Sequence, residues 1–345
     1  ALIQSSSATT VMVVSFVNAG LLTLTQSIGV IMGANIGTTV TAWLISALGF
    51  KVDIAAFALP LLAFGIPLLF SGKSSRKSVF GFSFLFMGLQ ALKANAPDLG
   101  ANPEMLAFVQ NYTDMGFLSI ILFLFIGAIL TMIVQASAAT MAITLIMCAN
   151  GWIDYHLGVA LVLGENIGTT ITANLAALTG NTQSRRAALA HLVFNIFGVM
   201  WVLVLFYPFT AAVSWFVTDV MNISDPAVAV SFKLAAFHTA FNISNTFIMI
   251  WFVGLIEKTV CFLIKGKKDE DEEYRLRYIT GGMLSTAELS ILQAHKEITL
   301  FAERTGRMLD MVKALFYEKN EDAFLKIYSR VEKYESISDR MEIEI

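Results

Sequence analysis

The sequence predicts an all-α polytopic membrane protein with two internal repeats and a soluble helical tail. Of its 345 residues, 56% are hydrophobic and only 14% are charged, and the mean hydropathy is +0.69. This composition is typical of membrane proteins. The charges concentrate after residue 257, where the last 88 residues hold 15 of the 23 Lys and Arg and 17 of the 26 Asp and Glu. We therefore divide the chain into a membrane domain (1–264), a charged linker (265–274) and a tail (275–345).

Two polar motifs occur twice in this apolar chain, with the same offset of 131 residues. The first is Gln4-Ser5-Ser6-Ser7-Ala8-Thr9, repeated as Gln135-Ala136-Ser137-Ala138-Ala139-Thr140. The second is Gly33-Ala34-Asn35-Ile36-Gly37-Thr38-Thr39, repeated as Gly164-Glu165-Asn166-Ile167-Gly168-Thr169-Thr170. The membrane domain is thus divided into repeat one (1–78) and repeat two (79–264). Apolar segments precede Gln135 but not Gln4, so we expect at least one further span before residue 1.

Several apolar segments approach the roughly 20 residues that a helix needs to cross a bilayer. They cover 27–48, 114–134, 157–178, 188–206 and 231–256, with shorter ones at 2–20 and 54–70. Glycines interrupt 27–48 and 157–178, so broken helices are expected there. Polar motifs at membrane depth must be buried in protein or line a polar cavity. We therefore expect each Gln-Ser motif to lie in a re-entrant hairpin.

Loop charge predicts the orientation of the repeats. If the basic clusters at 73–77, 185–186 and 265–268 lie on the inner side, segment 27–48 ends outside and the equivalent segment 157–178 ends inside. Equivalent positions then face opposite sides, which indicates inverted repeats, provided that 79–94 makes no net crossing. The tail would be cytoplasmic, and the protein a multi-pass protein of the cell inner membrane.

The chain carries no motif of a hydrolase, a P-loop or a zinc enzyme, so we expect no enzyme and no cofactor. Cys148 and Cys261 lie far apart in apolar sequence and form neither a disulfide framework nor a metal motif. No feature indicates nucleic-acid binding; the expected surroundings are the lipid bilayer.

The duplicated hydroxyl and amide residues suit the binding of ions. Na⁺ takes several oxygen ligands, whereas an oxyanion takes N–H and O–H donors such as those at helix N-termini. Close helix packing by small residues is the structural alternative. Glu165 is the one ionisable residue in a motif, and it is read either as functional or as a structural hydrogen-bonding group. The echo of His191–Asn195 in His238–Asn242 is interpreted as hydrogen bonding between helices.

The tail shows apolar stripes at helical spacing over 284–316 and from 323 onward, which predicts two helices joined by a turn at 319–322. Its first stripe is broad, so missing C-terminal residues or a second protomer of a homo-oligomer should cover it. Glu297, Glu303 and Asp310 are interpreted as solvated carboxylates rather than metal ligands.

The duplicated Gln-Ser and Gly-Ala-Asn-Ile-Gly-Thr-Thr motifs resemble those of the type II sodium–phosphate cotransporter family. The chain looks most like the bacterial branch, which has a cytoplasmic PhoU-like domain. The resemblance implies inverted repeats with re-entrant hairpins and Na⁺-driven movement of inorganic phosphate by alternating access. It assigns the ligand positions to Gln4, Ser5, Ser6, Ser7, Thr9, Asn35, Thr38, Thr39, Gln135, Ser137, Thr140, Asn166, Thr169 and Thr170. Glu165 joins this set from its own chemistry.

Ala136 and Ala138 depart from the family pattern, since they replace two serines of the second hairpin motif and remove two hydroxyls. The second repeat is therefore expected to supply fewer ligands or to bind a different set of cations. The alternatives are the same fold exporting phosphate or moving another small anion, and a membrane phosphate sensor without flux.

Overall fold

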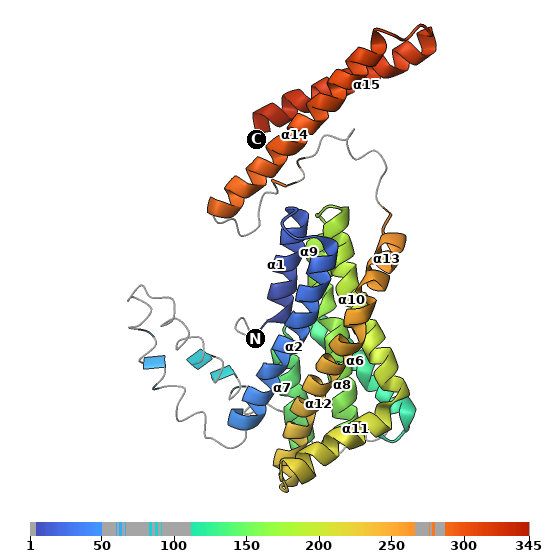
Figure 1. Ribbon diagram of the computed structural model, residues 1–345. Helices are drawn as coiled ribbons and strands as arrows, with labels where there is room; N and C mark the ends of the chain where they lie inside the picture. The colour runs from blue at the N-terminus through green and yellow to red at the C-terminus, as the bar shows by residue number, and fades with distance from the viewer. Residues whose placement is uncertain are drawn as a thin grey trace.

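The computed structural model is all-helical across the residues that it describes, which are 5–49, 112–265 and 287–344 with a few isolated positions between them (Figure 1). The helices of the membrane domain are α1 (Ser6–Asn18), α2 (Leu24–Gly49), α6 (Phe117–Val134), α7 (Ser137–Ala149), α8 (Tyr155–Gly168), α9 (Thr170–Ala177), α10 (Thr182–Val204), α11 (Phe206–Trp215), η2 (Phe216–Val220), α12 (Pro226–Met249), η3 (Ile250–Phe252) and α13 (Val253–Leu263). The tail contains α14 (Ala287–Leu315) and α15 (Glu321–Glu344).

Four helical segments in the described part are long and apolar enough to cross a membrane. They are Leu24–Ala47, Phe117–Val134, Thr182–Val204 and Val228–Leu263. The motif-bearing helices α1 and α7 are apolar but shorter, with 13 residues each. The predictions for 54–70, 73–77, 79–94 and most of 265–274 fall outside the described residues.

The helix boundaries repeat with the sequence motifs. Adding 131 to the bounds of α1 gives those of α7, and adding 131 to the start of α2 gives the start of α8. Ser5 and Ala136, which precede α1 and α7, share an extended backbone, with φ −142° and −139°. Gly20 and Gly151, which follow these helices, share positive φ values of 63° and 70°. The sequence repeat is therefore also a repeat of local structure.

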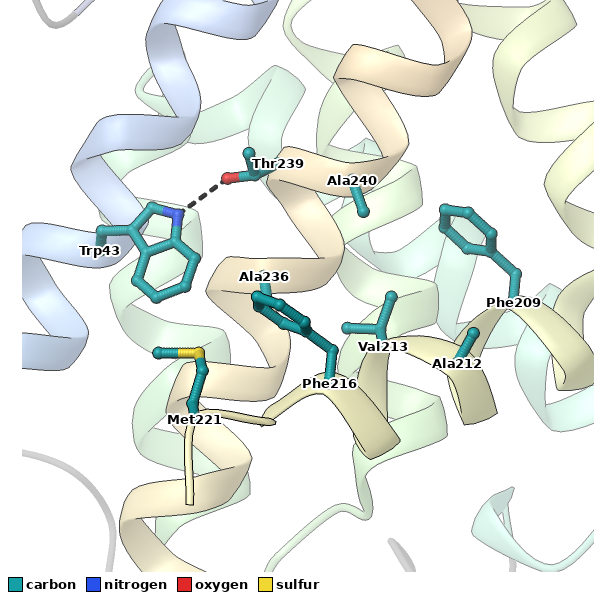
Figure 2. Close-up of a pocket in the computed structure, with 9 residues that line it drawn as sticks. All are labelled: Trp43, Phe209, Ala212, Val213, Phe216, Met221, Ala236, Thr239 and Ala240. Carbon is teal, nitrogen blue, oxygen red and sulfur yellow. Dashed lines mark hydrogen bonds between the residues drawn. The ribbon is translucent and has the colours of Figure 1, made fainter. Parts of the chain in front are cut away.

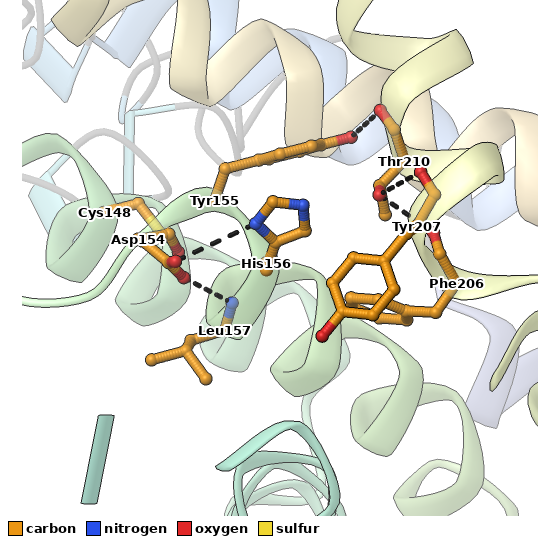
Figure 3. Close-up of polar contacts among 8 residues, drawn as sticks. All are labelled: Cys148, Asp154, Tyr155, His156, Leu157, Phe206, Tyr207 and Thr210. Atoms are coloured by element: carbon orange, nitrogen blue, oxygen red, sulfur yellow. Dashed lines mark hydrogen bonds and ion pairs between the residues drawn. The ribbon is translucent and has the colours of Figure 1, made fainter. Parts of the chain in front are cut away.

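Equivalent residues cap the second helix of each repeat. Before α2, Thr23 Oγ1 accepts from the backbone N–H of Gln26, and Gln26 Oε1 accepts from that of Thr23. This reciprocal pair is a capping box. Before α8, Asp154 Oδ1 accepts from the N–H of Leu157 at 2.8 Å (Figure 3). The cap positions, Thr23 and Asp154, again differ by 131.

One capping interaction is present in only one repeat. Ser5 Oγ accepts from the backbone N–H of Ala8 at 3.1 Å and caps α1. Ala136 occupies the same position before α7 and has no side-chain oxygen for this bond. Loss of such a cap costs about 1 kcal/mol. The first effect of the Ala136 substitution is therefore a less stabilised start of α7.

The expected break in the first motif helix is absent. α2 is a continuous helix of 26 residues through Gly33 and Gly37, which corrects the prediction of a broken helix there. In the second repeat, Thr169 separates α8 from α9, but its φ and ψ of −60° and −24° stay in the helical region. A helical glycine costs about 1 kcal/mol relative to alanine, which alone does not end a helix supported by tertiary packing.

Glycines bring α6 and α8 into backbone contact. A Cβ on Gly127 of α6 would meet the backbone of Leu161, and one on Gly164 of α8 would meet the backbone oxygen of Leu124. A Cβ on Gly168 would lie 2.5 Å from the oxygen of Ala128. Only a residue without a side chain allows this approach. The contact places α8 in the core, where Val159, Ala160, Val162 and Leu163 have no exposed surface.

The equivalent helices α1 and α7 end at different places in the bundle. At the end of α1, Asn18 accepts from the backbone N–H of Asn181 at 2.7 Å, and the Asn18 carbonyl accepts from the Asn181 side chain at 2.9 Å. At the end of α7, the α8 residue Tyr155 donates to the carbonyl of Thr210 in α11 at 3.4 Å (Figure 3). α1 occupies the upper half of the bundle and α7 the lower half in Figure 1.

The tail contains the predicted pair of antiparallel helices. Leu300 and Arg304 of α14 are buried with Tyr334, Ile337 and Met341 of α15. The rest of the α14 stripe stays open, since Ile298 and Leu309 remain 53% and 56% exposed. Ile298, Phe301, Thr305, Leu309 and other residues of this face line an apolar groove of about 480 Å³.

Glu297 corrects the prediction of a solvated carboxylate. It is completely buried, and its Oε2 accepts from the backbone N–H groups of Tyr278 and Ile279 at 2.6 and 3.4 Å. The carboxylate thereby fixes the segment before α14 against that helix.

The equivalent motif glycines provide a matched test of the α6–α8 contact. Gly164→Ala should destabilise the protein by roughly 1–3 kcal/mol, because its methyl group would overlap the Leu124 backbone. Gly33→Ala should leave stability unchanged or raise it by up to about 1 kcal/mol, because no atom lies within 4 Å of that added carbon. Thermal unfolding of the purified protein in detergent measures both. Equal shifts in the two variants would contradict the packing argument.

Candidate functional site

The Gln-Ser motifs lie at the starts of α1 and α7. Ser6 is the first residue of α1 and is buried, whereas Ser7 and Thr9 are half-buried. Ser137 begins α7 and is half-buried, and Thr140 is fully buried. Gln135 forms the tip of the helical hairpin between α6 and α7, where it is exposed and has a left-handed φ of 55°. Gln4 lies outside the described residues.

Helix starts at these positions present polar groups. The first N–H groups of a helix have no partner within the helix, and they carry partial positive charge. Each Gln-Ser motif therefore places backbone donors next to side-chain hydroxyls. This combination suits the binding of an anion.

The threonine hydroxyls of the motifs donate mainly to their own helices. Thr39 Oγ1 donates to the carbonyl of Ile36, Thr169 to that of Glu165 and Thr170 to that of Ile167, all at 2.7–2.8 Å. In the first repeat, Thr9 Oγ1 donates to the Ser5 carbonyl at 2.8 Å. A hydroxyl that donates in this way keeps its oxygen lone pairs available as acceptors. These threonines therefore suit a cation better than an anion.

Asn35 of α2 lies in the core and faces α10. Its Nδ2 donates to Asn195 Oδ1 at 2.9 Å, and its Oδ1 accepts from His191 Nε2 at 3.2 Å. Asn35 is 5% exposed. Thr38, one turn further along α2, is also buried. The first motif helix is thus joined to α10 through a polar contact.

Asn166 of α8 belongs to the same network. Its carbonyl accepts from Asn195 Nδ2 at 2.7 Å, and its side chain donates to the Val162 carbonyl at 2.8 Å. Asn242 Nδ2 of α12 lies 3.5 Å from Asn166 Oδ1. Asn195 therefore brings together the two predicted motif asparagines from α2 and α8.

Glu165 directly precedes Asn166 in α8 and is buried. It is 2% exposed, and its Oε2 has no hydrogen-bond partner among the described residues. Oε2 therefore makes no hydrogen bond to a neighbouring helix among the described residues. A buried charged carboxylate is costly without a partner, so the site favours a bound cation or a proton at this oxygen.

A pocket beside α2 is apolar and is separate from the polar network of Asn35, Asn166 and Asn195. It has a volume of about 600 Å³ and is lined by Trp43, Phe209, Ala212, Val213, Phe216, Met221, Ala236, Thr239 and Ala240 (Figure 2). The hydrogen bond between Trp43 Nε1 and Thr239 Oγ1, at 2.8 Å, uses the donor of the tryptophan. An apolar wall offers an inorganic anion no donors, so this pocket is not the ion site.

The set of ligand positions predicted from the sequence contains no residue of α10 or α12. The sequence predicts hydrogen bonds between helices at His191, Asn195, His238 and Asn242. Such bonds are present for His191, Asn195 and Asn242, whereas His238 Nδ1 has no hydrogen-bond partner among the described residues. The spacing of His and Asn four residues apart was the available signal, because it puts both on one helix face. Their partners, Asn35 and Asn166, are the motif residues themselves.

Metal-binding clusters of His, Cys, Asp or Glu do not occur among the described residues. The candidate site is instead built from hydroxyl, amide and backbone groups, together with the Glu165 carboxylate. This donor set suits hard monovalent cations and oxyanions.

Comparison with known proteins agrees with this chemistry. The profile of the Na⁺/Pi-cotransporter family matches residues 1–94 and 101–217. An uncharacterised protein of Bacillus subtilis, YqeW, is 32% identical over 77% of this chain and 82% of its own length. No solved structure matches.

Two further relatives carry functional names. A Salmonella typhimurium protein with the provisional name inorganic phosphate export protein YjbB is 26% identical over 94% of this chain, which spans 58% of that relative's length. Sodium-dependent phosphate transport protein 2B of Rattus norvegicus is 41% identical over 27% of this chain and 13% of its own length. The resemblance seen in the motifs is confirmed: the chain belongs to the Na⁺/Pi-cotransporter family.

Proposed function

We propose that this protein is a sodium-coupled secondary transporter of inorganic phosphate that works by alternating access in the cell inner membrane. The observation that carries the proposal is the buried polar network in which Asn195 joins both Asn-Ile-Gly-Thr-Thr motifs. Polar groups at this depth are costly unless they serve one another or a ligand. Membership of the family supports phosphate as the ligand.

The arrangement of the repeats supports alternating access. α1 ends beside Asn181, the N-cap of α10, whereas Tyr155, at the start of the α8 helix that follows α7, bonds to Thr210 of α11. We infer that the two repeats have inverted topology and that their Gln-Ser motifs meet near the membrane midplane. Inverted repeats allow one geometry to open toward either side of the membrane. Arg186 Nε donates to the Ile264 carbonyl at 3.0 Å, so the basic pair at 185–186 lies beside the end of α13, and we assign this end of the bundle to the cytoplasm.

The ligands divide by the chemistry of the groups. Thr38, Thr39, Thr169 and Thr170, with Glu165, would supply oxygens to Na⁺. Gln4, Ser5, Ser6, Ser7, Gln135 and Ser137, with the starts of α1 and α7, would supply donors to phosphate. Because no Lys or Arg occurs in the motifs, bound Na⁺ would provide the charge that an anion needs. This dependence makes coupling a consequence of the binding chemistry.

The tail is proposed to regulate transport as a PhoU-like domain, and one contact supports this role. Lys296 of α14 donates to the carbonyl of Gly20, and the Tyr278 ring packs on the same glycine. Lys296 Nζ also lies 5.8 Å from the centre of the Tyr278 ring. Gly20 ends the turn after α1, so a movement of the tail would act on the first hairpin motif.

Export of phosphate is the second candidate, and the name of the Salmonella relative favours it. In proteoliposomes with an inward Na⁺ gradient, we expect uptake of radiolabelled phosphate that disappears when choline replaces Na⁺. Loading the vesicles with phosphate and reversing the Na⁺ gradient tests the exporting direction. Saturable phosphate binding without flux in either direction would identify a sensor and overturn the transport proposal.

Ser6 and Ser137 are equivalent hydroxyls and should behave alike. Ser→Ala at either should raise the half-saturating concentration of phosphate or Na⁺ at least tenfold, because a buried hydrogen bond to a charged group contributes about 1.5–3 kcal/mol. Ser15→Ala is the control, since Ser15 lies on α1 outside the motif and donates to the Val11 carbonyl. Wild-type kinetics in both motif variants would remove these serines from the site.

Changes at the tail contact should alter regulation while transport persists. Lys296→Ala should change the initial rate of phosphate uptake because it releases Gly20, whereas Lys313→Ala should not, since Lys313 bonds only to Asp310 of its own helix among its described contacts. Deletion after Gly266 should leave Na⁺-dependent uptake intact. A truncated protein that folds but no longer transports would show that the tail belongs to the transport machinery.

A further inference from the structure

Asn195 of α10 uses both ends of its side-chain amide to connect two helices of different repeats. Its Oδ1 accepts from Asn35 of α2 at 2.9 Å, and its Nδ2 donates to the backbone carbonyl of Asn166 in α8 at 2.7 Å. The side chain is 1% exposed, so water does not replace either bond. A side-chain amide offers an acceptor and a donor side by side without carrying a charge.

The neighbouring His191 fixes the orientation of the contact. It lies one turn before Asn195 and donates from Nε2 to Asn35 Oδ1 at 3.2 Å. Both polar ends of Asn35 are therefore held by α10, and a flip of the Asn35 amide would oppose donor to donor and acceptor to acceptor. The position of Asn35 relative to Asn166 is thus set by a single helix face.

α12 repeats the pattern on the other side of Asn166. Asn242 lies one turn after His238, donates to the His238 carbonyl at 2.9 Å and approaches Asn166 Oδ1 at 3.5 Å. Its Oδ1 is buried and has no hydrogen-bond partner among the described residues. An acceptor remains open next to Asn166, whereas both the oxygen and the nitrogen of the Asn195 amide have a partner. Asn195 therefore acts on the motif residues and leaves the ligand positions to them.

We propose that Asn195 is a positioning residue that holds Asn35 and Asn166 in one geometry and so links ion binding at the two motifs. The proposal rests on the proposed function, in which these motifs bind Na⁺ and phosphate. Loss of the link should leave each motif able to bind but no longer arranged by the other. Loss of the link should therefore raise the half-saturating Na⁺ concentration and leave the maximal rate of phosphate uptake nearly unchanged.

Asn195→Ala should raise the half-saturating Na⁺ concentration for phosphate uptake about tenfold, the change expected for the loss of one or two buried hydrogen bonds. Asn195→Asp keeps the acceptor for Asn35 but sets a carboxylate oxygen against the Asn166 carbonyl, so it should raise the same concentration. Asn245→Ala is the matched control: Asn245 is also fully buried, but it bonds to Trp201 and Phe194 instead of a motif residue. It should change the Na⁺ requirement less than twofold at equal protein yield.

The outcomes separate the two proposals. A wild-type protein without Na⁺-dependent phosphate flux overturns the proposed function, and the inference with it, before any variant is made. Wild-type flux with equal Na⁺ requirements in Asn195→Ala and Asn245→Ala, or a fall in maximal rate alone, overturns only the inference. If Asn195→Ala does not fold, the comparison of Asn195→Asp with Asn245→Ala decides by the same criterion.

Discussion

The rest of the structure depends on the backbone contact between α6 and α8. Gly127, Gly164 and Gly168 carry no side chain at this contact, so the backbones of the two helices approach each other closely. In lipid, helices gain little from burying apolar surface, so close van der Waals packing has to supply the association. The contact fixes α8 in the core, and with it Glu165 and Asn166. The polar network is then built outward from a helix that cannot shift without losing this packing.

Features of the fold that depend on residues close together in the sequence could be predicted, whereas those that depend on distant contacts could not. The starts of α1, α2 and α8 are set by side-chain caps from Ser5, Thr23 and Asp154, which act within a few residues, and the predicted apolar segments 2–20, 27–48 and 157–178 cover most of these helices. Whether glycines break a helix depends on the packing around it, and the sequence alone did not reveal that α2 continues through Gly33. Asn35 and Asn195 are hydrogen-bond partners although 160 residues separate them in the sequence, so no local pattern predicts the pairing.

The hydroxyl groups show how the structural reading and the proposed ion-binding reading of the motifs are compatible. Thr39, Thr169 and Thr170 satisfy their protons on the backbone of their own helices, which is what a structural role requires. The same bonds turn their oxygens into pure acceptors, which is what a cation requires. Packing and ligation are therefore compatible in these residues. The distinction between the two readings lies in whether an ion reaches the oxygens.

The unequal caps of α1 and α7 would affect the relative energies of the two conformations of the proposed transporter. In the proposed alternating-access cycle, two identical halves would make the conformations open to either side equal in energy, and the resting protein would divide evenly between them. Ser5 caps its helix, whereas Ala136 cannot. A cap contributes about 1 kcal/mol. If the start of one hairpin helix loosens in one of the two conformations, this difference changes the ratio of their populations by roughly fivefold. Under the proposed mechanism, the oxygen that is missing at Ala136 would be enough to favour one of the two conformations.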